Sequence, residues 1–252
     1  NAVLGRANRL FVSSAKKLAI SYEKCSHVPN ILDENIVFTG MPLRPSVLIE
    51  YKVKYPILDP KSKIILSVFG GSQGATVFSD VVPSALSKIE KSLRSRITVT
   101  HQSRPEDIEK TKIAYQNIGI DADVEDFFND APKRIASSHL VICRAGASTI
   151  AELSAIGRPA ILVPYKYAVD DHQLLNAKAY EETGSGWLIK ENDFTSLVLE
   201  QKLKSLFLNP GKLKAAQLAS RKFGRREASN EIAKIIDELI ETEVKLAGRQ
   251  TI

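Results

Sequence analysis

The sequence has little cysteine and no long apolar run, and each absence excludes a class of protein. Its 252 residues include only two cysteines, Cys25 and Cys143, which are too far apart in the chain for a CxxC ligand pair. We therefore expect neither a disulfide framework nor a zinc site. No stretch approaches the roughly 18 consecutive apolar residues that span a bilayer, and the first residues lack the zones of a secretory signal. These features predict a cytoplasmic protein.

Signatures of several enzyme classes are also missing. The sequence contains no GxSxG nucleophile elbow, no Ser/His/Asp order and no histidine cluster with metal-ligand spacing. Asp121-Ala122-Asp123 has the DxD form of a metal-dependent sugar-nucleotide site, but it precedes the strand-like residues 124–126 and does not end them. We therefore interpret it as a surface turn. Hydrolase activity has little support, and we expect no metal and no cofactor.

The charge balance is basic without being concentrated. Lysine and arginine total 35 against 29 acidic residues, which gives a net charge of +6. This excess fits anionic partners such as phosphates, acidic lipid headgroups or nucleic acid, but the basic residues are scattered through helical segments. A solvated basic surface explains it more simply. Because no nucleic-acid-binding motif is present, we expect no nucleic-acid partner.

Residues 62–190 alternate short β-rich runs with longer amphipathic ones. The β-rich runs are residues 64–69, 97–101, 140–143 and 160–163. Such alternation predicts βαβ units, and hence an α/β fold with a parallel sheet covered by helices. After the first strand, apolar residues recur three and four apart from Val77 to Ile89 and predict a helix that Pro83 would kink or split.

The two ends of the chain have a different pattern. Residues 2–18 predict one helix, residues 37–39 a strand, and the proline-rich residues 42–60 an interdomain linker. Near the other end, Ser229 is expected to cap a helix with a single apolar stripe. Residues 1–42 therefore resemble the end of a separate domain.

Two glycine-containing loops each leave a predicted strand and enter a predicted helix. The first contains Gly70, Gly71 and Gly74, with a spacing that matches neither a Walker A loop nor GxGxxG. Glycines let backbone N–H groups approach an anion closely, and a helix start adds partial positive charge. Taken alone, this loop fits a phosphate site and a plain tight turn equally well.

The second loop runs from Cys143 through Gly146 into a helix. At the helix start, the N–H groups of Ala147, Ser148 and Thr149 would stay open and form a cradle suited to a diphosphate. Because both loops follow the carboxyl ends of neighbouring strands, they predict one ligand crevice at the edge of the sheet.

Three further groups are expected on the same rim. Glu152 lies one helical turn beyond the second loop, where a carboxylate can accept hydrogen bonds from both ribose hydroxyls. Alternatively, it is simply an acid that the helix dipole stabilises near the start of the helix. Phe127 and Phe128 could offer a wall and backbone groups to a nucleobase, or could be ordinary core residues. Residues 170–173 could bind sugar hydroxyls. His172 among them has the type of a general base, although a loop histidine is more often solvated.

Three runs together resemble the MurG family of bacterial glycosyltransferases, in order and spacing, over nearly the whole chain. They are residues 1–9, residues 39–44 with 70–75, and residues 144–152 with Asp171-His172-Gln173 and Asn176. The family transfers N-acetylglucosamine, with inversion, from UDP-N-acetylglucosamine to the undecaprenyl-linked muramoyl-pentapeptide lipid I. The product is lipid II, a precursor of peptidoglycan. The resemblance thus implies a hexosyltransferase of cell-wall biogenesis, linked to cell shape and cell division.

This resemblance implies a GT-B fold with a Rossmann-like donor domain. The expected parts are the remnant of an acceptor domain (1–42), a linker (43–60), the UDP-sugar donor domain (61–225) and a C-terminal helix packing back toward the acceptor domain (226–252). Implied partners are UDP-N-acetylglucosamine, lipid I and the anionic membrane surface, which would make the protein peripheral on the cytoplasmic face of the inner membrane. The oligomeric state stays open.

The family's donor contacts fall on definite positions of this sequence. By resemblance, Asn1, Arg44 and Ser72 would reach the sugar or diphosphate, Phe128 the uracil through its backbone, Ala147, Ser148 and Thr149 the phosphates, Glu152 the ribose, and Gln173 the hydroxyls of N-acetylglucosamine. The glycines of the phosphate loops are Gly70, Gly71, Gly74 and Gly146. Charge would grow on the leaving diphosphate in the transition state, so these groups would act without a metal.

The family's glycine-rich loop with a histidine, its best candidate for the base, has no counterpart in this sequence. No catalytic base can therefore be assigned, and we interpret the chain, which opens at Asn1, as lacking the first part of the acceptor domain. It should bind the donor weakly and transfer little by itself. The alternative is a non-catalytic UDP-sugar-binding subunit that needs a separate acceptor chain. A hydrolysing or epimerising enzyme of the same fold would require acids and a base that the sequence does not offer.

Overall fold

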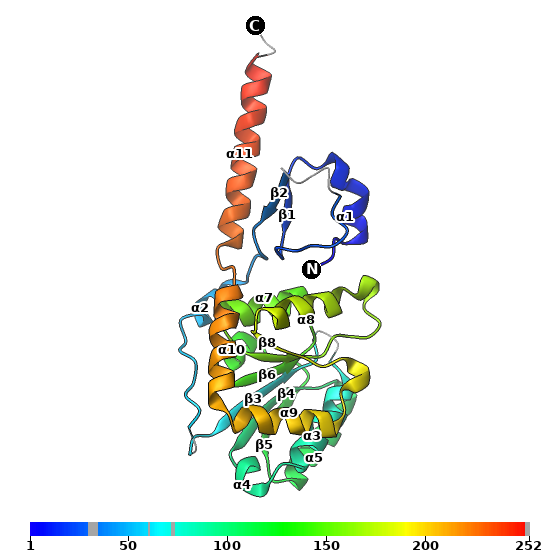
Figure 1. Ribbon diagram of the computed structural model, residues 1–252, viewed down its shortest axis with the longest axis vertical. Helices are drawn as coiled ribbons and strands as arrows, with labels where there is room; N and C mark the ends of the chain where they lie inside the picture. Colours follow the sequence, from blue (N-terminus) through cyan, green and yellow to red (C-terminus); the bar gives the residue numbers. More distant parts are fainter. Residues whose placement is uncertain (30–34, 60, 72–73, 250–252) are drawn as a thin grey trace.

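The computed structural model describes residues 1–29, 35–59, 61–71 and 74–249, with only the backbone of 246–249. Most of these residues surround one six-stranded parallel sheet (Figure 1). In chain order its strands are β3 (Ile64–Phe69), β4 (Ile97–Gln102), β5 (Asp121–Glu125), β6 (Leu140–Cys143), β7 (Ala160–Leu162) and β8 (Gly186–Leu188). Every neighbouring pair is parallel. The predicted α/β class is confirmed, and the four predicted strands match β3, β4, β6 and β7 to within one residue.

The strand order reverses in the middle of the sheet, and this reversal positions the site. Across the sheet the order is β5-β4-β3-β6-β7-β8, so the chain moves toward one edge after β3 and toward the other after β6. Phe69 pairs with Cys143, and the last residues of β3 and β6 therefore lie side by side. Connections that leave such a point in opposite directions open a crevice above the strand ends.

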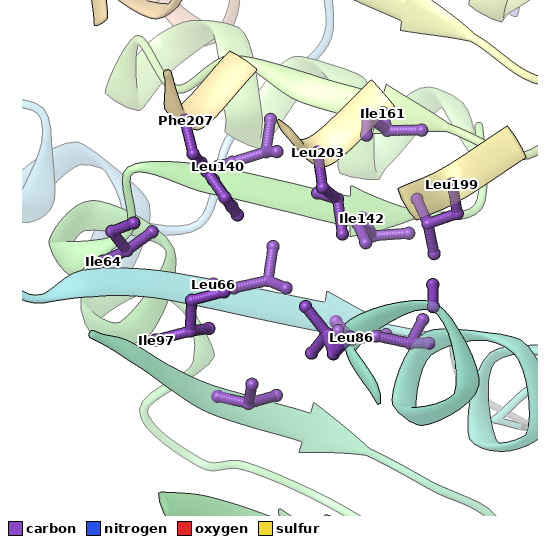
Figure 2. Close-up of a cluster of buried hydrophobic side chains, with 14 of the residues drawn as sticks. Ile64, Leu66, Leu86, Ile97, Leu140, Ile142, Ile161, Leu199, Leu203 and Phe207 are labelled. Atoms are coloured by element: carbon purple, nitrogen blue, oxygen red, sulfur yellow. The ribbon is translucent and has the colours of Figure 1, made fainter. Parts of the chain in front are cut away.

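Both faces of the sheet are buried because its central strands are apolar without interruption. In β6, Leu140 and Ile142 join one core while Val141 and Cys143 join the other. Helices α3 (Thr76–Ser87), α5 (Ile108–Asn117) and α9 (Ser196–Phe207) pack on the first face, and α6 (Ala131–Ser137), α7 (Ala147–Ile156) and α8 (His172–Glu182) on the second. Figure 2 shows Leu199, Leu203 and Phe207 of α9 over the first face. The short α4 (Lys91–Arg94) precedes β4, and α10 (Pro210–Phe223) contacts α7 and α9.

One local prediction in this unit was wrong, and one of two alternatives was excluded in another. Pro83 lies inside a single helix, α3, so it does not split the helix, and the kink given as the alternative stays a prediction. Burial of Phe78, Val82 and Leu86 stabilises the helix across the missing hydrogen bond. Asp121-Ala122-Asp123 is no surface turn: it begins β5, because pairing with β4 extends the strand to Asp121. The strand lies at the edge of the sheet, where Asp123 is ion-paired with a neighbouring arginine.

The first residues form a small separate layer with little helix. A single helix over residues 2–18 was predicted, but α1 (Arg6–Phe11) and one 3-10 turn, η1 (Val12–Ser14), are the helical parts described there. Residues 2–4 are extended and buried, and they exchange backbone hydrogen bonds with Ser26 at 2.9 Å. This non-local pairing overrides the local helical preference. Strands β1 (Leu18–Ile20) and β2 (Ile36–Phe38) pair in parallel beside it, where a strand over 37–39 was expected.

The segment between the two layers contains a helix, α2 (Pro45–Glu50), which packs on α6 and α7. The final helix, α11 (Ala228–Arg249), extends away from the large sheet alongside β1 and β2 (Figure 1). Ser229 does not cap it, because the helix begins one residue earlier and Glu227 accepts its first hydrogen bond, at 2.9 Å. Arg225, just before α11, donates to the carbonyl of Phe38 at 2.9 Å. In the described part of the chain, no helix combines the length and apolar character needed to cross a bilayer.

Candidate functional site

Two adjoining cavities lie above the carboxyl ends of β3 and β6. The first, of about 610 Å³, is lined among others by Arg44, Phe128 and Glu152, and the second, of about 670 Å³, by Gly70, Gly74, Arg144, Gly146 and Gln173. Gly71, Ser148 and Thr149 line both cavities. The start of α7 therefore stands where the two cavities meet, and the predicted crevice is present.

The start of α7 offers open backbone donors to this junction. Gly146 precedes the helix in an extended conformation, and no side chain caps it. The carbonyl of Gly146 accepts the first helical hydrogen bond, from Ile150 at 3.0 Å, so the N–H groups of the preceding turn have no intrahelical acceptor. These donors and the positive end of the helix dipole make the junction an anion-binding position.

The first glycine loop requires glycine for steric reasons. Gly71 and Gly74 have φ of 86° and 65°, a region that other residues rarely adopt. At Gly70, a Cβ atom would lie 2.5 Å from the backbone nitrogen of Ala75. The loop therefore turns tightly into α3 beside the junction. Ser72, predicted to contact the donor, lies outside the described residues.

Glu152 and Arg44 form an ion pair across the first cavity. One carboxylate oxygen of Glu152 accepts hydrogen bonds from Nε and Nη2 of Arg44 at 3.2 and 2.7 Å. The side chain of Glu152 is 15% exposed, whereas that of Arg44, just before α2, is 63% exposed. Exposed ion pairs contribute about 0–1 kcal/mol, so a hydroxyl-bearing ligand could take Arg44's place on the carboxylate. Both predicted residues therefore face the same cavity.

Phe128 is packed against two neighbouring side chains at the wall of the first cavity. Its ring meets Phe69 edge-on with centroids 6.3 Å apart, and the guanidinium of Arg134 lies 4.1 Å from its centroid. Only 6% of Phe128 is exposed, while Phe127 is 64% exposed, so the pair is not simply two core residues. Because the Phe128 ring is packed away, its backbone and the exposed Phe127, which also lines this cavity, are the parts that can contact a flat ligand.

Two polar side chains that follow β7, those of Gln173 and Asp170, point to different places. Gln173 lines the second cavity, and its Oε1 accepts a hydrogen bond from the backbone of Tyr165 at 2.9 Å. Asp170 points elsewhere, because it pairs with Arg6 at 3.0 Å and Arg9 at 2.8 Å. Among residues 170–173, which were predicted to bind sugar hydroxyls, only Gln173 lines one of the two adjoining cavities.

His172 and Asn1 lie together outside the two adjoining cavities. Both line a separate cavity of about 230 Å³, and the Nδ1 of His172 is bound to the carbonyl of Val169 at 2.7 Å. Asn1 accepts a hydrogen bond from Asn176 at 3.1 Å. The fully buried Asn176 also donates to Ala145 at 3.1 Å, so it ties the first layer to the loop before α7.

Most of the residues that line the two adjoining cavities belong to a domain with recognisable relatives. Residues 65–238 match the model of the glycosyltransferase family 28 C-terminal domain, which covers both glycine loops and every wall of the second cavity. The chain belongs to this family.

Individual family members extend the match to nearly the whole chain. A protein of Paramagnetospirillum magneticum named UDP-N-acetylglucosamine--N-acetylmuramyl-(pentapeptide) pyrophosphoryl-undecaprenol N-acetylglucosamine transferase is 46% identical over 96% of this chain and 66% of its own length. A protein of the same name from Granulibacter bethesdensis is 42% identical, over 96% of this chain and 62% of its own. The chain thus spans slightly less than two thirds of these relatives. The resemblance to the MurG family is confirmed.

The fold agrees with these relatives. The crystal structure of MurG from Acinetobacter baumannii superimposes with a TM-score of 0.79 at 26% identity, over 94% of this chain and 65% of that one. The family 28 chain therefore has the GT-B type of fold, with its parallel sheet forming the Rossmann-like part. The limits drawn at residues 42, 60 and 225 remain predictions.

Sequence reasoning missed two charged residues of this family 28 domain. Arg144 and Glu191 line the second cavity, form an ion pair and are each only 13% exposed. Arg144 directly follows a buried strand that leads into the site, which is a usable signal. Glu191 lies in a 3-10 turn, η5 (Glu191–Asp193), beyond β8, and nothing in its local sequence points to the site.

Proposed function

We propose that this chain carries the UDP-N-acetylglucosamine-binding part of an inverting transferase that makes lipid II from lipid I. The observation that carries the proposal is the pair of cavities meeting at the start of α7. This geometry suits a ligand with a nucleoside at one end, a sugar at the other and a diphosphate between them. The names of the relatives supply the identity of that sugar and of the acceptor.

The donor fits the cavities in one orientation. Uracil would lie against the backbone of Phe128 and the ribose on Glu152 in the first cavity. The diphosphate would rest on the N–H groups of Ala147, Ser148 and Thr149, with Arg44 turning toward it. N-acetylglucosamine would enter the second cavity, toward Gln173. Asn1 and Ser72 are further proposed contacts, from the resemblance alone.

The proposed reaction is attack by the muramoyl 4-hydroxyl on the anomeric carbon of the donor. The bond from that carbon to the diphosphate breaks, UDP leaves with the electron pair, and the product has inverted configuration. The proton of the attacking hydroxyl passes to a base, a role to which no residue of this chain is assigned. Negative charge on the leaving diphosphate increases in the transition state, so donors already aimed at it lower the barrier. The start of α7 and Arg44 would have this role.

The larger arrangement follows as part of the same proposal. Residues 61–225 would be the donor domain, 1–42 the end of the acceptor domain, 43–60 the linker, and 226–252 a helix packing against the acceptor side. The ion pair between Lys16 and Glu243 and the bond from Arg225 to Phe38 support that packing. Because the acceptor is a membrane lipid, the protein would act at the cytoplasmic face of the membrane. Its net charge of +6 would favour binding to an anionic membrane surface.

Calorimetric titration of the purified chain with UDP, UDP-N-acetylglucosamine and UDP-glucose tests the proposal. We expect the N-acetylglucosamine donor to bind more tightly than UDP-glucose, because the second cavity would contact the sugar. A correctly folded chain that binds no uridine nucleotide would refute the proposal. Equal affinity for the two sugar donors would refute its sugar specificity.

Donor binding should not depend on a divalent cation. The diphosphate would be neutralised by the start of α7 and by Arg44, and no group of three potential metal ligands occurs among the described residues. We expect the Kd for UDP to change by less than about twofold between buffers containing Mg²⁺ and buffers containing EDTA. A tenfold weakening in EDTA, with the fold intact by circular dichroism, would contradict this.

A further inference from the structure

The wall of the second cavity contains a charged pair that the proposed donor contacts leave unused. We infer that Arg144 and Glu191 act as a positioning pair that holds Tyr165 and Gln173, and through them sets how much the donor's sugar adds to nucleotide binding. The inference rests on the proposed function, because it concerns the subsite assigned to the sugar.

Arg144 is immobilised from several sides. Its guanidinium lies over the rings of Phe78 and Tyr165, 5.1 and 5.3 Å from their centroids. Its Nη1 donates to the carbonyl of Val163 at 3.2 Å and also to the carboxylate of Glu191. Both charged side chains are 13% exposed, so this pair is much better shielded from solvent than the one between Arg44 and Glu152. Solvent screening of the pair is correspondingly weak.

The pair is linked to Gln173 through a short chain of contacts. Arg144 fixes the backbone at Val163 and the ring of Tyr165, two residues further along. The N–H of Tyr165 donates to Oε1 of Gln173 at 2.9 Å. With its oxygen engaged in this way, Gln173 can offer its amide NH₂ group to a ligand as a hydrogen-bond donor. Displacing Tyr165 would therefore turn or release the amide that is assigned to the sugar.

Neutralisation by Glu191 argues against the simpler interpretation of Arg144 as a phosphate ligand. A guanidinium already paired with a carboxylate has little net charge to offer a diphosphate. The uncapped start of α7 and the exposed Arg44 are better suited to bind the diphosphate. Arg144 and Glu191 would thus affect the sugar contact and leave the nucleotide contact intact.

The test measures affinities for UDP and UDP-N-acetylglucosamine in parallel, using the whole chain. The ratio of the two Kd values is the sugar increment. We expect Glu191→Gln to reduce the sugar increment by about 5- to 10-fold, the effect of roughly one hydrogen bond. UDP itself should bind as before or more tightly, because the freed Arg144 gains net charge. Asp193→Asn, in the same 3-10 turn but outside the cavity lining, is the matched control and should change neither affinity.

A double variant with Gln173→Ala tests whether Glu191 positions Gln173 or merely stabilises the fold. In a Gln173→Ala background, Glu191→Gln should produce no further loss of the sugar increment, since the group it positions is already gone. Additive losses, or parallel weakening of UDP and UDP-N-acetylglucosamine, would overturn the inference. Should Glu191→Gln fail to fold, Arg144→Lys keeps the charge but removes the planar fork, and the same pattern is expected.

The wild-type titration distinguishes the two levels of the proposal. A wild-type chain whose sugar increment is absent would refute the proposed donor and this inference together. A clear wild-type increment that survives Glu191→Gln unchanged would refute only the inference.

Discussion

Glu152→Ala is expected to raise the Kd for UDP by at least about 30-fold. The proposed ribose contact consists of two hydroxyls donating to one carboxylate, and hydrogen bonds to charged groups contribute about 1.5–3 kcal/mol each. Losing the existing ion pair with Arg44 offsets little of this, since exposed pairs contribute about 0–1 kcal/mol. Calorimetry on the variant and the parent chain measures the difference directly.

Two comparisons make this result specific to the ribose. Glu182→Ala, an exposed acid on α8 away from both cavities, should leave the Kd unchanged. Removing the ribose 2′-hydroxyl from UDP should raise the Kd of the parent chain by roughly tenfold. The Glu152→Ala variant should bind UDP and the deoxy compound with the same Kd. A variant that still binds UDP within about threefold of the parent would show that Glu152 does not hold the ribose.

Arg158→Met is expected to lower the free energy of unfolding by about 3–5 kcal/mol, because it removes the donors from buried carbonyls. Arg158, two residues after the end of α7, is fully buried. Its guanidinium donates hydrogen bonds to the backbone carbonyls of Val53, Lys54, Ala136, Ile156 and Gly157. Burial lowers its pKa to about 10, so the group remains charged at neutral pH.

Thermal and urea denaturation of the purified variants measure this loss. Arg94→Met is the matched control, because Arg94 also donates to carbonyls, at 2.7 and 3.3 Å, but near the surface. That variant should lose less than about 1 kcal/mol. Equal losses for the two variants would mean that burial of Arg158 adds nothing to its hydrogen bonds. The expected fall in Tm for Arg158→Met is on the order of 10 °C.

The central strands could be predicted well because their signal is local. Residues 140–143 are apolar without interruption, and both faces of β6 are buried, so the run itself specifies a strand covered on two sides. The two glycine loops are also contiguous in sequence, and each adjoins a strand that was identified. Consequently the start of α7 and its relation to β3 and β6 followed from the residues alone.

Elements that depend on distant partners were predicted poorly. The helix expected over residues 2–18 gave way to extended pairing with Ser26, and β5 begins at Asp121 because β4 lies beside it. A pattern of neighbouring residues contains no information about a pairing segment 20 or more residues away. The same reason explains Ser229, since the first turn of α11 begins at Ala228 and follows a residue that is bound to the first layer, Arg225.

For the site, the sequence by itself determined which loops meet a ligand, whereas the tertiary structure decided which side chains face one another. Gly146, Ser148 and Glu152 lie on one short stretch, so helical geometry alone orders them. Arg44 and Glu152 are 108 residues apart, and Arg144 and Glu191 are 47 apart. Such pairs form because the strand order reverses between β3 and β6 and brings remote segments over one crevice, and that reversal has no local signature in the sequence.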